Sequence, residues 1–241
     1  METDISSNVS LIRQRMDAAC SRCGRDPQSV RLMAVSKTVA PERIRQALDA
    51  GVTLLGENYV QEAREKIPTV GHAAEWHMIG HLQTNKVKYV VNLFDWIHSL
   101  DRLELARELD KRAGQNNRRL NVLIEVNVSG EESKSGIEAI QALELVRQVS
   151  PLPHINLCGL MTMPPYSDNP ENSRPYFQAL RKLRDDISAA GIPGIHMDEL
   201  SMGMTDDFEV AVEEGATIVR IGRALFSQAS AADAGGTAGS R

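Results

Sequence analysis

Short apolar runs alternate with amphipathic stretches along most of the chain. The segments between the runs, such as 41–50 and 103–112, carry apolar residues at helical spacing. Eight runs have the length and composition of buried strands, at 31–36, 53–57, 75–79, 96–99, 121–127, 156–162, 198–201 and 217–221. Eight strand-turn-helix units in one α/β chain favour a single closed (β/α)8 barrel of the TIM type over an open doubly wound sheet.

Local signals mark the ends of the predicted helices. Pro41 stands at a position where the first turn of a helix tolerates proline. Gly51, Gly191 and Gly215 each follow a helical stretch and are candidates for the glycine that ends a helix. These helix-start and helix-end signals fall between the predicted strands, as a repeated βα pattern requires.

Two segments flank the predicted barrel. Residues 5–23 predict an extra helix before the first strand, so that the barrel domain occupies 1–227. Residues 228–241 are rich in Gly, Ala and Ser and predict a disordered tail. No G-x-G-x-x-G motif follows the first strand, which disfavours a dinucleotide-binding fold.

Composition limits the function classes. The chain has 241 residues, 42% hydrophobic content and a formal net charge of −5, with no run of more than two consecutive Lys or Arg. The electrostatic footprint of a nucleic-acid-binding protein is therefore missing. No apolar run approaches the roughly 18 residues of a membrane span, and the polar N-terminus lacks a signal-peptide core, so we expect a cytoplasmic protein. Three cysteines give no disulfide framework.

Candidate chemistry gathers at the ends of three predicted strands. Lys37 follows the first strand, Ser201 ends the seventh and Gly203 lies just after it, and Gly222 follows the eighth. The carboxyl ends of barrel strands share one rim, and phosphate commonly binds the loops after the last two strands. A desolvated rim lysine is suited to forming a Schiff base with a carbonyl. A strand-end lysine is more often a solvated surface residue and a glycine more often a turn, but their joint placement predicts a site for a phosphorylated aldehyde.

Two weaker patterns stay open or are set aside. Cys20 and Cys23 form a lone C-x-x-C at a helix end without further ligands, which does not predict a zinc or redox centre. Glu125 and Asn127 lie in an apolar strand. Either side chain could form a polar layer inside the barrel or be satisfied by neighbouring groups.

Five longer motifs carry a family resemblance. They are AVSKT at 34–38, GENYVQE at 56–62, WHMIGHLQTNK at 76–86, LSMGM at 200–204 and VRIG at 219–222. Over about residues 5–227 the chain resembles the YggS/PROSC family of pyridoxal phosphate homeostasis proteins. The resemblance implies a fold-type III barrel, similar to the N-terminal domain of alanine racemase, that binds pyridoxal 5′-phosphate (PLP) without established catalytic turnover. It also implies buffering or delivery of PLP to PLP-dependent apo-enzymes.

The same resemblance implies roles for single residues. Lys37 would hold PLP as a Schiff base, and Arg220 would face the pyridine nitrogen. A permanent cation cannot accept the pyridinium proton, so the ring would be a poorer electron sink than with a carboxylate partner. Asn58 would lie beside the ring. The phosphate cradle would be formed by Ser201, Gly203, Met204 and Gly222.

Two function classes follow from this resemblance, beside a third in which the barrel is only structural. The first is a non-catalytic carrier, in which Lys134 could serve as a secondary, transient attachment point. The second is an enzyme, either an amino-acid racemase or a Schiff-base lyase. Racemases that are similar to this barrel use an added β domain with a catalytic tyrosine across a dimer interface, whereas the barrel elements here finish near Phe226. We therefore expect a monomeric carrier.

Overall fold

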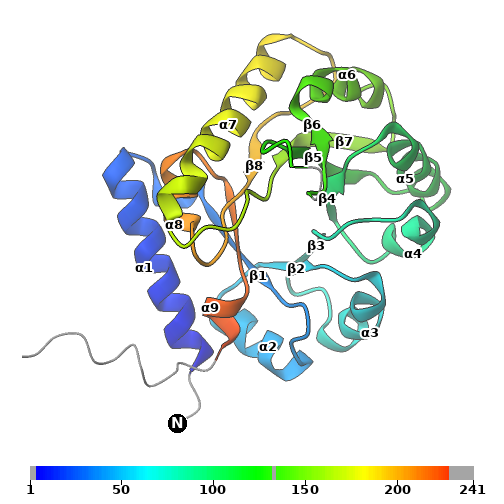
Figure 1. The fold of residues 1–241 in the computed structure, drawn as a ribbon. Coiled ribbons are helices and arrows are strands. Elements are labelled where there is room, and N and C mark those ends of the chain that lie inside the picture. The colour runs from blue at the N-terminus through cyan, green and yellow to red at the C-terminus, as the bar shows by residue number, and fades with distance from the viewer. Residues whose placement is uncertain (1–3, 132–133, 228–241) are drawn as a thin grey trace, which may run out of the picture.

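A closed ring of parallel strands forms the centre of the molecule (Figure 1). The computed structural model describes residues 4–131 and 134–227. The strands pair in the order β4-β3-β2-β1-β9-β8-β7-β5, and a further pairing of β5 with β4 closes the ring. These strands are β1 (Arg31–Val35), β2 (Leu54–Glu57), β3 (Glu75–Met78), β4 (Trp96–Leu100), β5 (Leu120–Asn127), β7 (Ile155–Met161), β8 (Glu199–Ser201) and β9 (Ile218–Ile221). The predicted eight-stranded barrel is confirmed, and each strand begins and ends within one residue of the predicted position.

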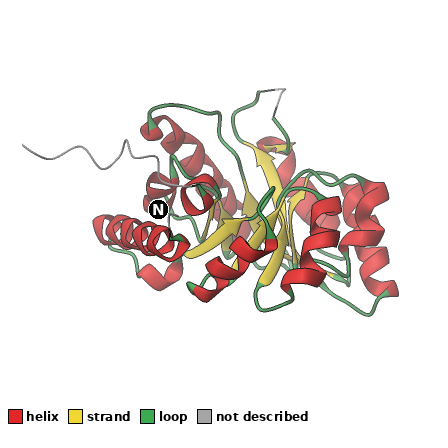
Figure 2. Cartoon of the chain, turned by 90° about the horizontal axis from the view of Figure 1, so that it is seen from below, coloured by secondary structure: helices red, strands yellow, loops and turns green. Residues whose placement is uncertain are grey.

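Helices cover the outside of this ring (Figure 2). The two-residue strand β6 (Ile137–Glu138) pairs with β5 only and is no part of the closed ring. The helices are α1 (Ile5–Cys23), α2 (Pro41–Asp49), α3 (Val60–Val70), α4 (Val87–Val90), α5 (Leu103–Gln115), α6 (Ala139–Val149), α7 (Arg174–Ala189), α8 (Phe208–Glu213) and α9 (Arg223–Phe226). The described residues also form three short 3-10 turns, η1 (Pro27–Ser29), η2 (Thr84–Lys86) and η3 (Pro170–Ser173). Helix α1 is the predicted extra helix, and it packs against α8, α9 and α2.

Glycines end three of these helices as predicted. Gly51, Gly191 and Gly215 follow α2, α7 and α8 with φ angles of 82°, 62° and 104°. After α2, the N–H of Gly51 donates to the Leu48 carbonyl at 2.8 Å, and the next N–H donates to the Ala47 carbonyl at 3.0 Å. This pair of bonds is the Schellman motif, which satisfies carbonyls that the last helical turn leaves open.

Side chains alternate between two environments along the barrel strands. Those that point outward pack against the helices in one large apolar core. Two smaller apolar clusters lie apart from that core, the first made of Met33, Val35, Leu54, Ile79 and Ile218, the second of Trp96, Leu123, Cys158 and Met161. Buried polar side chains alternate in the same register, namely His77, His98, Glu125, Ser201 and Arg220. The interior of the barrel is therefore partly polar.

Two sequence predictions concern residues that lie outside the described ranges or next to them. The predicted tail, 228–241, lies outside the described residues, so its disorder stays a prediction. Lys134 is partly buried and directly follows residues 132–133, which also lie outside them. Within the described ranges, no helix is both long enough and apolar enough to cross a bilayer.

Close backbone contact makes one glycine of β7 a test of barrel packing. A Cβ atom on Gly159 would lie 2.0 Å from the Glu199 carbonyl oxygen and 2.7 Å from its carbon. The Glu199 backbone, unlike a side chain, cannot rotate to relieve this clash. Gly159→Ala should therefore lower the free energy of unfolding by about 3 kcal/mol in urea titrations. Gly114→Ala is the control, since the three atoms nearest to its Cβ would all belong to the imidazole of His154, a partly exposed side chain that can rotate. Equal losses in the two variants would contradict this assignment.

Candidate functional site

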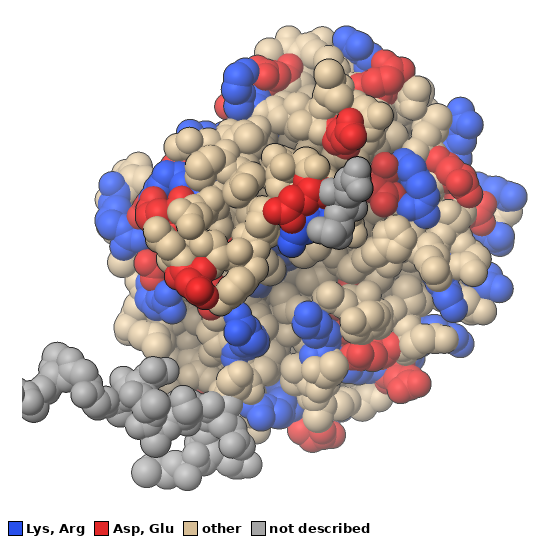
Figure 3. Space-filling view, in the orientation of Figure 1, with Lys and Arg blue, Asp and Glu red and all other residues tan. Residues whose placement is uncertain are grey.

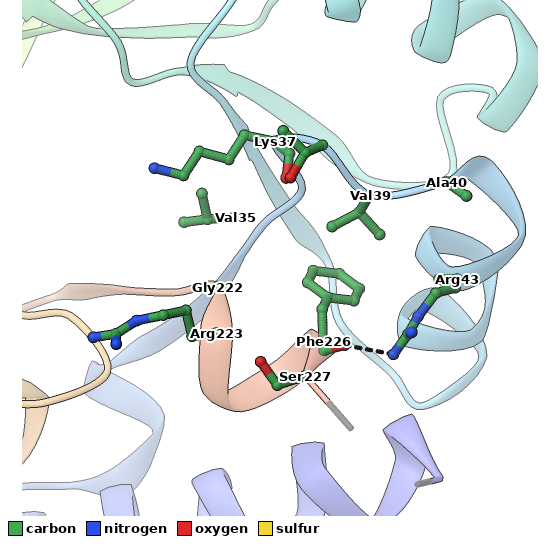
Figure 4. A pocket seen from close by; sticks show the side chains of 10 residues that line it. Val35, Lys37, Val39, Ala40, Arg43, Gly222, Arg223, Phe226 and Ser227 are labelled. Carbon is green, nitrogen blue, oxygen red and sulfur yellow. Dashed lines mark hydrogen bonds between the residues drawn. The ribbon is translucent and has the colours of Figure 1, made fainter. Parts of the chain in front are cut away.

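A cavity of about 440 Å³ opens where β1 and β9 end (Figure 4). The parallel pairing of these strands, with Ala34 beside Ile221, brings the β1–α2 loop next to the β9–α9 turn. The cavity is lined by Val35, Lys37, Thr38, Val39, Ala40, Arg43, Gly222, Arg223, Phe226 and Ser227. On the face shown in Figure 3, Lys and Arg side chains lie along the edge of the central hollow. This rim is suited to an anionic ligand.

Three cations border the cavity, and they differ in how they are paired. Arg43 donates to the Phe226 carbonyl, and Arg223 donates to the Asp206 carboxylate. The Lys37 amine has no hydrogen bond or ion pair to any residue within 4–131 and 134–227. Lys37 and Arg223 extend their charged ends toward the same side (Figure 4). Among the three, Lys37 therefore has the nitrogen most available for a ligand.

Lys66 anchors the chain just before Lys37. Its Nζ donates to the Ser36 carbonyl at 2.7 Å, to Glu57 at 3.0 Å and to Glu62 at 2.8 Å. Burial raises the pKa of Glu57, and its hydrogen bonds from the Ser36 hydroxyl, at 2.7 Å, and from Lys66 oppose that shift. The cluster fixes the end of β1 from outside the barrel and leaves the Lys37 side chain to the cavity.

Thr38 anchors the chain just after Lys37. Its φ of 61° lies in the left-handed region, which costs energy for a β-branched residue. Its N–H donates to Glu62 at 2.8 Å, the same carboxylate that Lys66 binds. The backbone on both sides of Lys37 is thus tied to one cluster, which limits where its side chain can start.

Arg220 is a buried cation without a carboxylate partner among the described residues. Its side chain is 4% exposed and points into the barrel. One nitrogen donates to the Ser201 hydroxyl at 2.7 Å and another to the Thr162 carbonyl at 2.8 Å. Burial lowers its pKa to about 10. A charge held in this way is desolvated but not neutralised, so a ligand with lone pairs or negative charge would be stabilised beside it.

Glu125 is the buried carboxylate of the barrel interior. Burial raises its pKa to about 7, the charge of Asp101 adds to this shift, and Arg220 opposes it. One of its oxygens is buried and has no hydrogen-bond partner within residues 4–131 and 134–227. Asn127 differs, since its amide donates to the Glu131 carbonyl at 2.8 Å and belongs to the following loop. Of the two positions that the sequence left open, only Glu125 contributes to the inner polar layer.

The other predicted site residues surround these groups. Asn58 borders a second cavity of about 230 Å³, and its side-chain oxygen Oδ1 is buried without a hydrogen-bond partner among the described residues. Gly203 has a φ of 91°, and a Cβ there would lie 2.5 Å from that of Ala211. Met204 is 37% exposed, and its N–H donates to Asp207 at 2.7 Å. Each of them therefore lies at a strand end on the predicted rim.

The structure joins the predicted residues in two groups. Lys37 and Gly222 border the same cavity. Ser201 and Arg220 form a hydrogen bond, and the Gly203 carbonyl accepts from the Arg220 N–H at 3.0 Å. The Ser201 hydroxyl lies fully buried inside the barrel, and its place in a phosphate cradle stays a prediction.

Sequence reasoning missed four contributors. Arg223 directly follows Gly222 in the rim turn, and its charge was the available signal. His98 could have been found from the period of two along 96–99, which places it on the inner face with Trp96. For Lys66 and Thr38 we see no sequence signal, because their roles depend on contacts between separate elements.

The pH dependence of stability should depend on Glu125. Because burial raises its pKa from 4.5 to about 7, the folded protein keeps a proton that the unfolded chain loses between these values. The contribution of Glu125 to the free energy of unfolding is therefore fully present below pH 4.5, where its carboxyl is protonated in both states, and it is lost as pH rises through 7. Glu125→Gln should therefore be more stable than the parent at pH 8, by about 2 kcal/mol in urea titrations, and similar to it near pH 5. Exposed Glu65→Gln should show no such pH-dependent gain, and a destabilised Glu125→Gln at pH 8 would contradict the assignment.

Sequence comparisons agree with this architecture. Residues 6–230 match the family model described as alanine racemase, N-terminal domain. The pyridoxal phosphate homeostasis protein of Aquifex aeolicus is 49% identical over 221 residues, which are 91% of this chain and 96% of that protein.

Solved structures add two further likenesses. PipY of Synechococcus elongatus with PLP bound is similar with a TM-score of 0.80 at 32% identity, covering 92% of this chain and 100% of that one. Alanine racemase of Clostridium difficile has a TM-score of 0.76 at 14% identity, covering 95% of this chain and 58% of that one, and shares the fold alone. The chain therefore belongs to the family of pyridoxal phosphate homeostasis proteins, which is built on the barrel of the alanine racemase N-terminal domain.

Proposed function

We propose that the protein binds PLP covalently at Lys37 and acts as a non-catalytic carrier that buffers PLP or delivers it to apo-enzymes. One observation carries this proposal: the Lys37 amine, without a partner in the described part of the chain, borders a cavity of about 440 Å³ with Arg43 and Arg223. In the covalent step the amine nitrogen bonds to the aldehyde carbon, and the aldehyde oxygen leaves as water. The related PipY structure, which has PLP bound, supports the choice of ligand.

The residues present fit this cofactor. The proposed site comprises Lys37, Asn58, Ser201, Gly203, Met204, Arg220 and Gly222. The buried, unpartnered oxygen of Asn58 and the unneutralised cation of Arg220 are polar groups that a heteroaromatic phosphate ligand could satisfy. Gly203 and Gly222 allow backbone to approach a phosphate. When bound, PLP supplies an aldehyde and an electron-withdrawing ring.

Arg220 favours binding over turnover in this proposal. A guanidinium facing the ring nitrogen can donate a hydrogen bond but has no lone pair with which to take a proton. The ring nitrogen then stays unprotonated, and the ring withdraws electrons less strongly than beside a carboxylate. The alternative, a racemase or a Schiff-base lyase, is less well supported, because the Aquifex aeolicus relative is named for PLP homeostasis and the alanine racemase likeness is 14% identical.

Replacing Lys37 tests the attachment point. Wild-type protein mixed with PLP should show a visible Schiff-base absorption band, and borohydride reduction followed by peptide mapping should place the cofactor on Lys37. Lys37→Ala should lose the band, because no other amine borders the cavity among its lining residues. Lys111→Ala, which removes an exposed lysine of α5, should keep it. Reduced cofactor found mainly on another lysine, such as Lys134, would contradict the assignment.

Transfer in the presence of a phosphatase tests delivery. Phosphatase destroys free PLP, whereas PLP passed directly between proteins is protected. Loaded protein should therefore still activate an apo-enzyme when phosphatase is present, and it should not racemise alanine above the rate of free PLP. If phosphatase abolishes activation, release into solution is the only route, and the delivery role is wrong.

A further inference from the structure

The Ser201 hydroxyl lies between a cation and a histidine inside the barrel. Its Oγ is 2.7 Å from a nitrogen of Arg220 and 3.0 Å from Nδ1 of His98. Nε2 of His98 is in turn 2.9 Å from Nδ1 of His77. All four side chains are buried, the most exposed being Arg220 at 4%. They form a continuous hydrogen-bonded chain from β9 through β8 and β4 to β3.

The groups at the two ends indicate which atoms donate and which atoms accept along this series of hydrogen bonds. At one end, a guanidinium can only donate, so the Ser201 oxygen accepts from Arg220. At the other end, Nε2 of His77 forms no hydrogen bond among the described residues, and a carboxylate oxygen of Glu75 lies 3.5 Å from it. A hydrogen on that nitrogen is favoured beside a negative charge, which makes Nδ1 of His77 the acceptor.

Each remaining bond then has one possible donor. Because Nδ1 of His77 accepts, Nε2 of His98 carries the hydrogen, and Nδ1 of His98 accepts from the Ser201 hydroxyl. Burial lowers the pKa of both imidazoles, so the neutral forms that this pattern requires are favoured. The His77 imidazole stacks on Trp96, with 5.4 Å between the ring centroids and 8° between the planes, and this contact holds the ring in place.

Resting on the proposed function, we infer that Ser201 and His98 are positioning residues that hold the Arg220 guanidinium toward the cofactor ring, and that Ser201 is not a phosphate ligand. A phosphate needs hydrogen-bond donors, and the single hydrogen of Ser201 is committed to His98. The partners that hold Arg220 are neutral, so they orient its charge without cancelling it. Glu125 lies close enough to affect the pKa of Arg220 but forms no ion pair with it within 4.0 Å.

Histidine tautomers test the chain in the ligand-free protein. Long-range 1H–15N spectra of 15N-histidine-labelled protein should show His77 and His98 as neutral Nε2–H tautomers. In Ser201→Ala the His98 Nδ1 resonance should shift, because its donor is gone. A hydrogen on Nδ1 of His98 would free the Ser201 hydroxyl for a ligand and would overturn the inference.

Two ligands separate positioning from phosphate binding. Ser201→Ala should weaken binding of PLP and of pyridoxal, which lacks the phosphate, by the same factor of about tenfold. In an Arg220→Lys background, Ser201→Ala should weaken ligand affinity by less than about twofold, because lysine lacks the planar guanidinium that Ser201 would orient. The matched control is Ser99→Ala on the same strand as His98, which removes a buried serine hydroxyl that has no hydrogen-bond partner in the described part of the chain.

The outcomes separate this inference from the proposed function. Loss of PLP affinity with unchanged pyridoxal affinity would make Ser201 a phosphate ligand and would overturn the inference, as would unchanged affinity for both ligands. Wild-type protein that shows no band dependent on Lys37 would instead overturn the proposed function. The tautomer spectra, which need no ligand, would still decide whether the chain of hydrogen bonds exists.

Discussion

Pairing of the first barrel strand with the last is the contact on which the site depends. Strands β1 and β9 come from opposite ends of the described chain, and their register sets Met33 beside Arg220. Because the strands are parallel, their carboxyl ends reach the same rim, where Lys37 and Gly222 border one cavity. Closure between β4 and β5 completes the ring, which holds β1 and β9 in one fixed geometry.

The buried polar side chains of the barrel interior lower the stability of the fold, which suggests that they have a role in ligand binding. Burying a cation without a counter-ion is unfavourable, and Arg220 recovers part of that cost through a serine hydroxyl and a backbone carbonyl. Glu125 adds a second buried group whose charged form is disfavoured. Two small apolar clusters contain other residues of the same strands, such as Ile218 of β9 and Leu123 of β5. A barrel evolved for stability alone would have filled these positions with apolar side chains, so the polar groups are best explained by a ligand at the rim.

Local signals explain what could be predicted from the sequence. Strand bounds follow from short apolar runs between turn residues, and Gly51 could be assigned because the Schellman motif needs a positive φ. The position of Lys37 and Gly222 on one rim follows from parallel strand order alone. Partner choice inside the barrel could not be predicted, since the contact of Ser201 with His98 joins strands that are distant in sequence and not neighbours in the ring. For this reason the sequence placed Ser201 at the rim but gave no indication of the partners of its buried hydroxyl.

The most direct measurement is a crystal structure of the protein soaked with PLP. Covalent binding at the rim predicts continuous electron density from Nζ of Lys37 to the former aldehyde carbon. The Arg220 guanidinium should lie within hydrogen-bond distance of the ring nitrogen and keep its contact with Ser201. Density for PLP at any other lysine, or an occupied rim cavity with an unmodified Lys37, would contradict the central claim.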